Sequence, residues 1–172
     1  MADGLEVEVV SGREIKQVVD ALRAVDKKAP ARVRKEMRTI ARSGAKVVKT
    51  KARKLPAKGV AGGTQARPHK RRQLRRALAR GVKIQASTSG RRGVGLRIVT
   101  SMESRSQAFL PRAMDLVPEW QHPLFGTQRK VTQQGGHGWF VAPLGEMRPE
   151  MEQALRKLVD DSVEEIRRAA GG

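Results

Sequence analysis

The chain has 172 residues and a formal net charge of +19 at pH 7, with 36 Lys and Arg against 17 Asp and Glu. Because it contains no cysteine, disulfides and thiolate metal sites are excluded. No apolar run approaches the roughly 20 residues of a membrane-spanning helix, and the first residues lack the features of a signal peptide. We therefore expect a soluble protein of one domain.

The positive charge is concentrated in one third of the chain. Residues 27–80 hold 20 of the 36 Lys and Arg and one acidic residue, Glu36, while the remainder is balanced. Such a block creates a local positive field that attracts polyanions, of which nucleic acid is the commonest. An anionic membrane or an acidic protein surface stays open as the partner.

The first two elements are predicted from the spacing of apolar residues. Residues 5–10 alternate apolar and acidic side chains before ending apolar, which is typical of a short strand with one exposed face. Ser11 and Glu14 form a capping-box pattern. Apolar residues then recur at helical spacing, so an amphipathic helix is predicted over 12–26.

A second, longer helix is predicted over residues 30–54. Pro30 suits its first turn, and an apolar stripe from Val33 to Ala52 continues to its end. Such a helix would be about 38 Å long, with Gly44 as a weak point and a candidate bend. Its other faces carry almost only lysine and arginine.

After this helix the apolar residues change from helical spacing to the alternating spacing of strands. Residues 55–68 are rich in Gly, Pro and Ala and predict a flexible loop, followed by one or two helical turns over 69–78. Apolar residues then alternate over 82–86 and again over 94–98. The turn-forming residues between these two runs predict a β-hairpin.

The last third of the chain is predicted to be mixed. A short helix over 109–117 ends at Pro118, and residues 119–140 are expected to be irregular, apart from a strand near 130–133 and another beginning at Trp139-Phe140. Pro149 is expected to introduce the final helix.

These elements predict an α+β fold, in which a long N-terminal helical region and a C-terminal helix pack on a small antiparallel β-sheet. Helix should exceed strand. Within one domain overall, we expect a strand and basic helical region over 1–54, a flexible basic loop over 55–72, and an α+β core over 73–172.

Signals for enzymatic chemistry are nearly absent. His69, His122 and His137 have no spacing or carboxylate partners typical of a metal site, and a surface or structural role explains them. The glycine-rich stretch 90–95 lacks the Lys-Ser/Thr ending of a phosphate loop and lies in the predicted hairpin turn. We expect no catalytic residues, no cofactor and no metal.

Contact with a polyanion is the better-supported role. A solvated helix normally alternates acids and bases, whereas this block has only Glu36. All five aromatic residues lie between 109 and 140, so the basic block has no aromatic side chain on which a base could stack. The backbone phosphates of double-stranded DNA are therefore the expected target. The candidate residues are Arg34, Lys35, Arg38, Arg42, Lys46, Lys49, Arg53, Lys70, Arg71, Arg72, Arg75 and Arg76.

The aromatic cluster is the second candidate feature. It can serve as a small core that fixes a loop, or as an assembly contact, since Trp and Phe are favoured at interface centres. Both roles stay open. The candidate assembly and packing residues are Trp120, His122, Pro123, Phe125, Gly126, Trp139 and Phe140.

Three segments of this region carry a family resemblance: His122 to Gly126, Lys130 to Gln133, and Gly138 to Phe140. Together they resemble the neck and tail-completion morphogenesis family of long-tailed bacteriophages, also described as head–tail connector or minor tail proteins. The resemblance covers about residues 30–168 and leaves the strand and helix of residues 1–26 unmatched.

The resemblance implies a structural virion protein that forms a ring, expected to contain six copies, at the head–tail junction. DNA would pass through this ring, and other neck and tail proteins would be neighbours. The protein would occupy the host cytoplasm before assembly. The alternative is a free, sequence-nonspecific nucleic-acid-binding protein associated with the nucleoid or the ribosome; a membrane-surface binder is a further rival.

Overall fold

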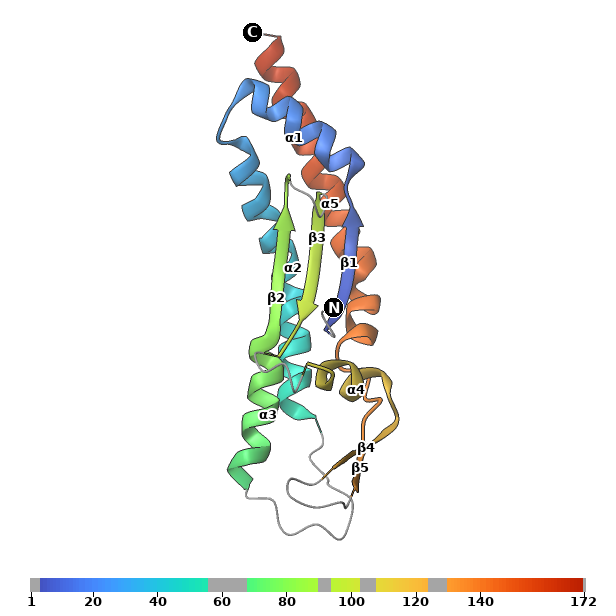
Figure 1. The fold of residues 1–172 in the computed structure, drawn as a ribbon. Helices are drawn as coiled ribbons and strands as arrows, with labels where there is room; N and C mark the ends of the chain where they lie inside the picture. Colours follow the sequence, from blue (N-terminus) through green and yellow to red (C-terminus); the bar gives the residue numbers. More distant parts are fainter. Residues whose placement is uncertain (1–3, 56–67, 90–93, 103–107, 124–129, 172) are drawn as a thin grey trace. The chain divides into compact units, whose positions relative to one another are not determined.

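The computed structural model describes residues 4–55, 68–89, 94–102, 108–123 and 130–171. A three-stranded antiparallel sheet has the order β1-β3-β2, and a second sheet pairs β4 with β5 (Figure 1). The predicted α+β fold is confirmed. The elements in chain order are β1 (Leu5–Ser11), α1 (Arg13–Val25), α2 (Ala29–Lys54), α3 (Pro68–Gly81), β2 (Val82–Ser87), β3 (Gly95–Thr100), α4 (Leu110–Leu116), β4 (Glu119–Pro123), β5 (Lys130–Gln134) and α5 (Val141–Ala170).

Backbone contacts divide the chain into two compact units. The first unit consists of Met1–Leu5, Lys46–Lys83 and Val99–Leu144, and the second of Glu6–Ala45, Ile84–Ile98 and Gly145–Gly172. Each unit is therefore assembled from three segments that are distant in the sequence. The three consecutive segments predicted above do not coincide with these units.

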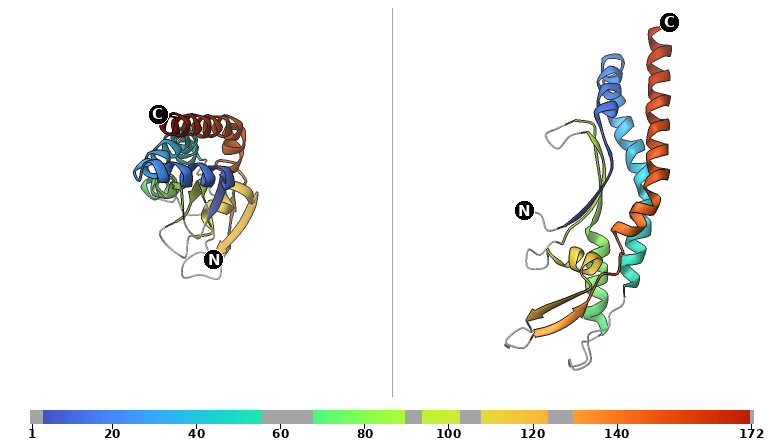
Figure 2. Two further views of the ribbon diagram at one scale, coloured as in Figure 1. Left: turned by 90° about the horizontal axis from the view of Figure 1, so that it is seen from above. Right: turned by 90° about the vertical axis from the view of Figure 1, so that its right-hand side faces the viewer.

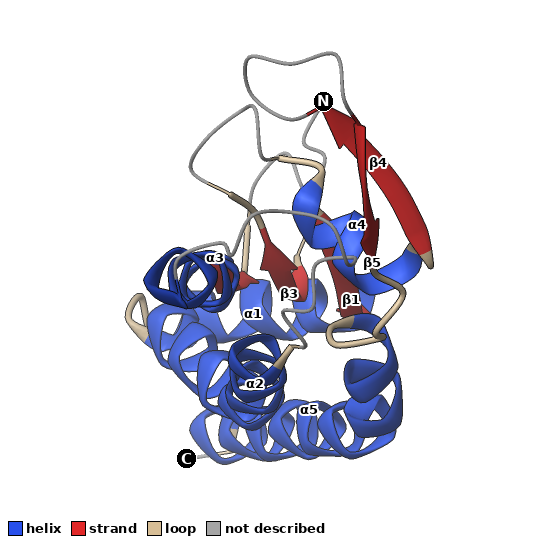
Figure 3. Cartoon of the chain, turned by 90° about the horizontal axis from the view of Figure 1, so that it is seen from below, coloured by secondary structure: helices blue, strands red, loops and turns tan. Residues whose placement is uncertain are grey.

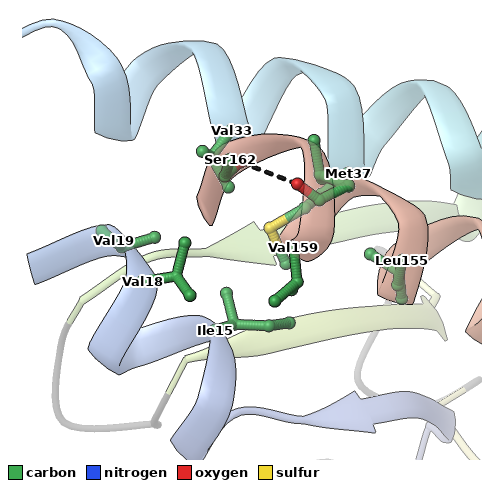
Figure 4. Close-up of a pocket in the computed structure, with 9 residues that line it drawn as sticks. Ile15, Val18, Val19, Val33, Met37, Leu155, Val159 and Ser162 are labelled. Carbon is green, nitrogen blue, oxygen red and sulfur yellow. Dashed lines mark hydrogen bonds between the residues drawn. The ribbon is translucent and has the colours of Figure 1, made fainter. Parts of the chain in front are cut away.

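The second unit has a core of aliphatic side chains from three helices. Ile15 and Val19 of α1, Met37 of α2 and Leu155 of α5 are buried and point toward one another (Figure 4). A cavity of about 10 Å³ remains among them, and its one polar side chain, Ser162, donates a hydrogen bond to the carbonyl of Leu158 over 2.7 Å. In this unit α2 and α5 lie on one face of the sheet, and no helix of the described residues covers the other, open face (Figure 2).

The first unit contains the junction between the small sheet and α5. β4 and β5 form an antiparallel pair beside α4 (Figure 3), with Trp120 opposite Gln133. The link from β5 to α5 then runs along the end of α4, where the N–H groups of His137 and Gly138 donate to the carbonyls of Met114 and Asp115 over 3.1 and 3.0 Å. These bonds fix the position at which the next helix begins.

A side chain at Gly136 in this link is expected to destabilise the protein. Its φ of +66° is a conformation that L-residues adopt at a cost, and an added Cβ would lie 3.0 Å from the Cα of Pro118. We expect Gly136→Ala to lower the free energy of unfolding by about 1–2 kcal/mol, measured by urea denaturation. Gly145→Ala is the matched control: it lies inside α5 with open space around the new methyl group, so it should stabilise by about 0.5–1 kcal/mol.

Three predictions about the last third of the chain are wrong. The last helix begins at Val141 rather than Pro149, which lies inside it, and Trp139 and Phe140 immediately precede this helix instead of beginning a strand. Residues 119–123 form β4 instead of an irregular stretch, because they pair with β5.

Two predictions about the N-terminal half also need correction, whereas the bend at Gly44 stays a prediction. The N-cap of α1 is Gly12 rather than Ser11, and the side chains of Ser11 and Glu14 lie outside the described ones. α2 is continuous through Gly44, which is buried. α3 begins at Pro68, so residues 68–72 of the predicted loop are helical, and residues 56–67 lie outside the described part.

Candidate polyanion-binding surface

Six basic residues on α2 follow one another at spacings of three or four positions, which places them on one side of the helix. They extend about 27 Å along the axis. Lys49 is partly buried and the other five residues are exposed. We call this set the basic stripe: Lys35, Arg38, Arg42, Lys46, Lys49 and Arg53.

The direction of the basic stripe is set by the buried side of the same helix. Val33, Met37, Ala41, Val48 and Ala52 are buried and recur at the same helical spacing. With 3.6 residues per turn, the centres of the two sets lie about 120° apart around the axis. Packing of the apolar side against the rest of the protein therefore turns the basic stripe toward solvent.

No neutralising partner accompanies the basic stripe in the described part of the chain, where none of its residues forms an ion pair with an acidic side chain. The last helix behaves differently, since Lys157 pairs with Asp161 over 3.0 Å and Arg148 with Glu152 over 2.6 Å at i,i+4. Like charges at this spacing destabilise a helix by about 0.2–0.5 kcal/mol per pair. The basic stripe retains this repulsion.

Arg32, at the start of α2, is neutralised and does not belong to the basic stripe. Its guanidinium pairs with Asp26 over 2.8 Å and with Glu165 of α5. Arg32 and Glu165 line a groove of about 220 Å³ that also includes Glu36, the one acidic residue of α2. Arg32 therefore links the start of α2 to the last helix. Sequence spacing gives no signal for this pair, because its members are 133 positions apart.

The other predicted cations are less uniform. Arg34 is exposed on a different side of α2, and its Nε donates to the carbonyl of Pro30 over 3.3 Å. On α3, Arg76 is exposed, whereas the Nε of Arg75 is buried and has no hydrogen-bond partner within the described residues. The remaining cations of α3 have side chains outside the described ones: Lys70, Arg71 and Arg72.

Trp139 and Phe140 are core residues of the first unit. Their exposed fractions are 1% and 0%, and their rings meet edge to face with centroids 5.4 Å apart. Of the two roles left open for the aromatic cluster, this geometry supports packing within one chain. The side chains of Trp120, His122 and Pro123 and all of Phe125 and Gly126 lie outside the described residues.

Asp115 holds the backbone of Phe140 at the start of α5, and the sequence interpretation missed it. Its carboxylate is 2% exposed and accepts hydrogen bonds from the N–H of Phe140 over 2.6 Å and from the N–H of Val141 over 3.2 Å. A carboxylate at this place satisfies donors that a helix leaves free at its start. The available signal was an acidic residue in line with the apolar residues that α4 buries, Pro111, Ala113 and Met114.

Within the described ranges, no group of three or more His, Cys, Asp or Glu side chains is arranged to hold a metal ion. His137 is exposed, and the side chains of His69 and His122 are not among the described ones. The helices of the described residues include none with the length and apolar character needed to cross a membrane.

Comparison of the chain with protein-family models, curated proteins and solved structures gave no match. The likeness to the phage neck family therefore rests on the quoted residues between 120 and 140 alone. The basic stripe is an independent observation, because it follows from spacing, exposure and charge.

Proposed function

We propose that this chain is a non-enzymatic structural protein of the bacteriophage neck, which assembles into a ring at the head–tail junction and directs its basic stripe toward the DNA that passes through. The observation that carries the polyanion contact is the row of outward-facing cations on α2, which form no ion pair within the described residues. The phage setting is supported by the resemblance of residues 120–140.

Backbone phosphates are the target that fits the basic stripe best. Its residues are lysine and arginine only, and all five aromatic residues of the chain lie outside residues 27–80. Without stacking side chains, recognition of single-stranded bases has no basis there. Lysine and arginine alone bind the phosphates of a duplex without reading sequence. Such binding is weak enough to let DNA slide, as passage through a neck requires.

The neck role is tested by disrupting the gene in the phage that encodes it. We expect heads filled with DNA and complete tails to accumulate separately, visible by electron microscopy, with infectious titre restored when the intact gene is supplied in trans. Supply of a variant with an early stop codon is the matched control. Joined, infectious particles from the disrupted phage would contradict the proposal.

The same unpaired cations favour a second candidate, a free nucleic-acid-binding protein. With about six phosphate contacts, such a protein should bind duplex DNA with a log–log salt slope near −5 and should still bind it measurably at physiological salt. A neck protein should bind isolated duplex measurably only at low salt. Binding to anionic vesicles in preference to DNA would favour the membrane-surface rival instead.

A further inference from the structure

Both outer strands of the three-stranded sheet have one unpaired side. The order β1-β3-β2 places β3 in the centre, and no further strand of the described residues adjoins β1 or β2. β1 has seven residues and β2 has six, the usual length of a strand. The free N–H and C=O groups of such edges are a template on which a further strand can pair.

The two edges carry opposite charges on the open face of the sheet. Glu6 and Glu8 are exposed on β1, and Lys83 is exposed on β2. Between them, the Nε of Arg97 on β3 lies 3.1 Å from Glu6, and its Nη2 lies 3.4 Å from Glu8. One cation thus faces two carboxylates, which leaves the β1 edge acidic and the β2 edge basic.

This charge pattern discriminates among the ways in which two copies can pair. Two β1 edges would bring glutamates together, and two β2 edges would bring lysines together. Like charges opposite each other in neighbouring strands are destabilising, whereas opposite charges stabilise the pair. Only the contact between β2 of one copy and β1 of another brings Lys83 close to Glu6 and Glu8.

We propose that β2 of one copy adds to β1 of the next copy, so that the three-stranded sheets join edge to edge through a head-to-tail contact. Such a heterologous contact leaves a free edge at each end of a chain of copies, and it ends only when the ring closes. The inference deepens the proposed function, because it identifies the surface through which the ring would assemble.

The absence of cysteine from the natural sequence makes a cross-linking test specific. Glu8→Cys marks the β1 edge and Gln85→Cys, also exposed, marks the β2 edge. With a short bis-maleimide cross-linker, we expect the purified double variant to form a ladder of dimers, trimers and larger species. A mixture of the two single variants should give dimers only, and neither single variant should cross-link with itself.

A matched control moves one cysteine away from the sheet. Gln153→Cys on the exposed side of α5, combined with Glu8→Cys, should give no ladder. Lys83→Glu in the double variant should lower the ladder yield by about two- to fivefold, and adding Glu6→Lys should recover it. Circular dichroism checks that each variant is folded.

The outcomes separate this inference from the neck role. No ladder from the folded double variant, or dimers from a single variant alone, would overturn edge pairing. If the gene disruption nevertheless leaves heads and tails unjoined, the neck role stands and the ring uses another surface. A clear ladder together with joined particles from the disrupted phage would support edge pairing and refute the neck role.

Discussion

Asp115→Ala is expected to lower the free energy of unfolding by about 2–4 kcal/mol, a large effect for one side chain outside the aliphatic core. The carboxylate accepts two backbone hydrogen bonds at the start of α5, of 2.6 and 3.2 Å. Phe140, which donates the shorter one, is fully buried, so its N–H would find no water in the variant. An unsatisfied buried donor carries its full desolvation cost.

Two variants sharpen this prediction, measured by urea denaturation followed by circular dichroism. Asp115→Asn keeps one acceptor oxygen and should lose about 1 kcal/mol, since it can retain one of the two bonds. Asp161→Ala is the matched control: this aspartate is exposed on α5 and pairs with Lys157, so its loss should change stability by less than about 0.5 kcal/mol. Equal effects of Asp115→Ala and Asp161→Ala would mean that the carboxylate does not secure the start of α5.

The same carboxylate explains why the start of α5 was not predicted. Proline commonly occupies the first turn of a helix, and this favoured Pro149. The observed start lies eight residues earlier, where donors at Phe140 and Val141 meet an acceptor about 25 positions away in the sequence. A cap supplied by another element has no local signature. Pro149 is accommodated inside the helix, although it has no N–H to give to Gly145.

Elements with their own periodicity were predicted well. α2 was expected over 30–54 and spans Ala29–Lys54, because its apolar residues repeat at helical spacing from end to end. β4 has no such pattern: its five residues end with Pro123 and form a strand because β5 pairs with them, His122 lying opposite Val131. Tertiary pairing of this kind is not visible in a single segment.

The candidate surface likewise has one part that the sequence predicts and other parts that depend on tertiary contacts. The spacing of lysine and arginine on α2 was sufficient to identify the basic stripe, since the helix and its buried side were both predictable. The pairing of Arg32 with Glu165 was not predictable, because it joins two helices that are distant in the sequence. The burial of the Arg75 Nε was not predictable either, because it depends on how α3 packs.

Removal of three charges from the centre of the basic stripe is expected to weaken duplex binding strongly. We predict that Arg38→Gln, Arg42→Gln and Lys46→Gln together lower the affinity for a short DNA duplex by about 100-fold at low salt. Each phosphate contact contributes about −0.9 to the log–log salt slope, so the slope should change from about −5 to about −3. Fluorescence anisotropy at several salt concentrations measures both quantities.

A control with the same change in net charge distinguishes the basic stripe from general positive charge. Lys27→Gln, Arg112→Gln and Arg156→Gln remove two arginines and one lysine that are exposed on other parts of the chain. We expect the slope of this variant to change by less than about one unit. An equal loss of affinity and slope in both triple variants would show that net charge alone attracts the DNA.

The stability of the basic-stripe variant should move in the opposite direction from its affinity. Arg34, Arg38, Arg42 and Lys46 are successive neighbours at i,i+4, so the three substitutions remove three like-charge repulsions of about 0.2–0.5 kcal/mol each. Weaker binding by a slightly more stable protein cannot be attributed to unfolding. A loss of stability in this variant would instead mean that these cations have partners in the folded chain. The basic stripe would then be neutralised within the protein and would not be a binding surface for a polyanion.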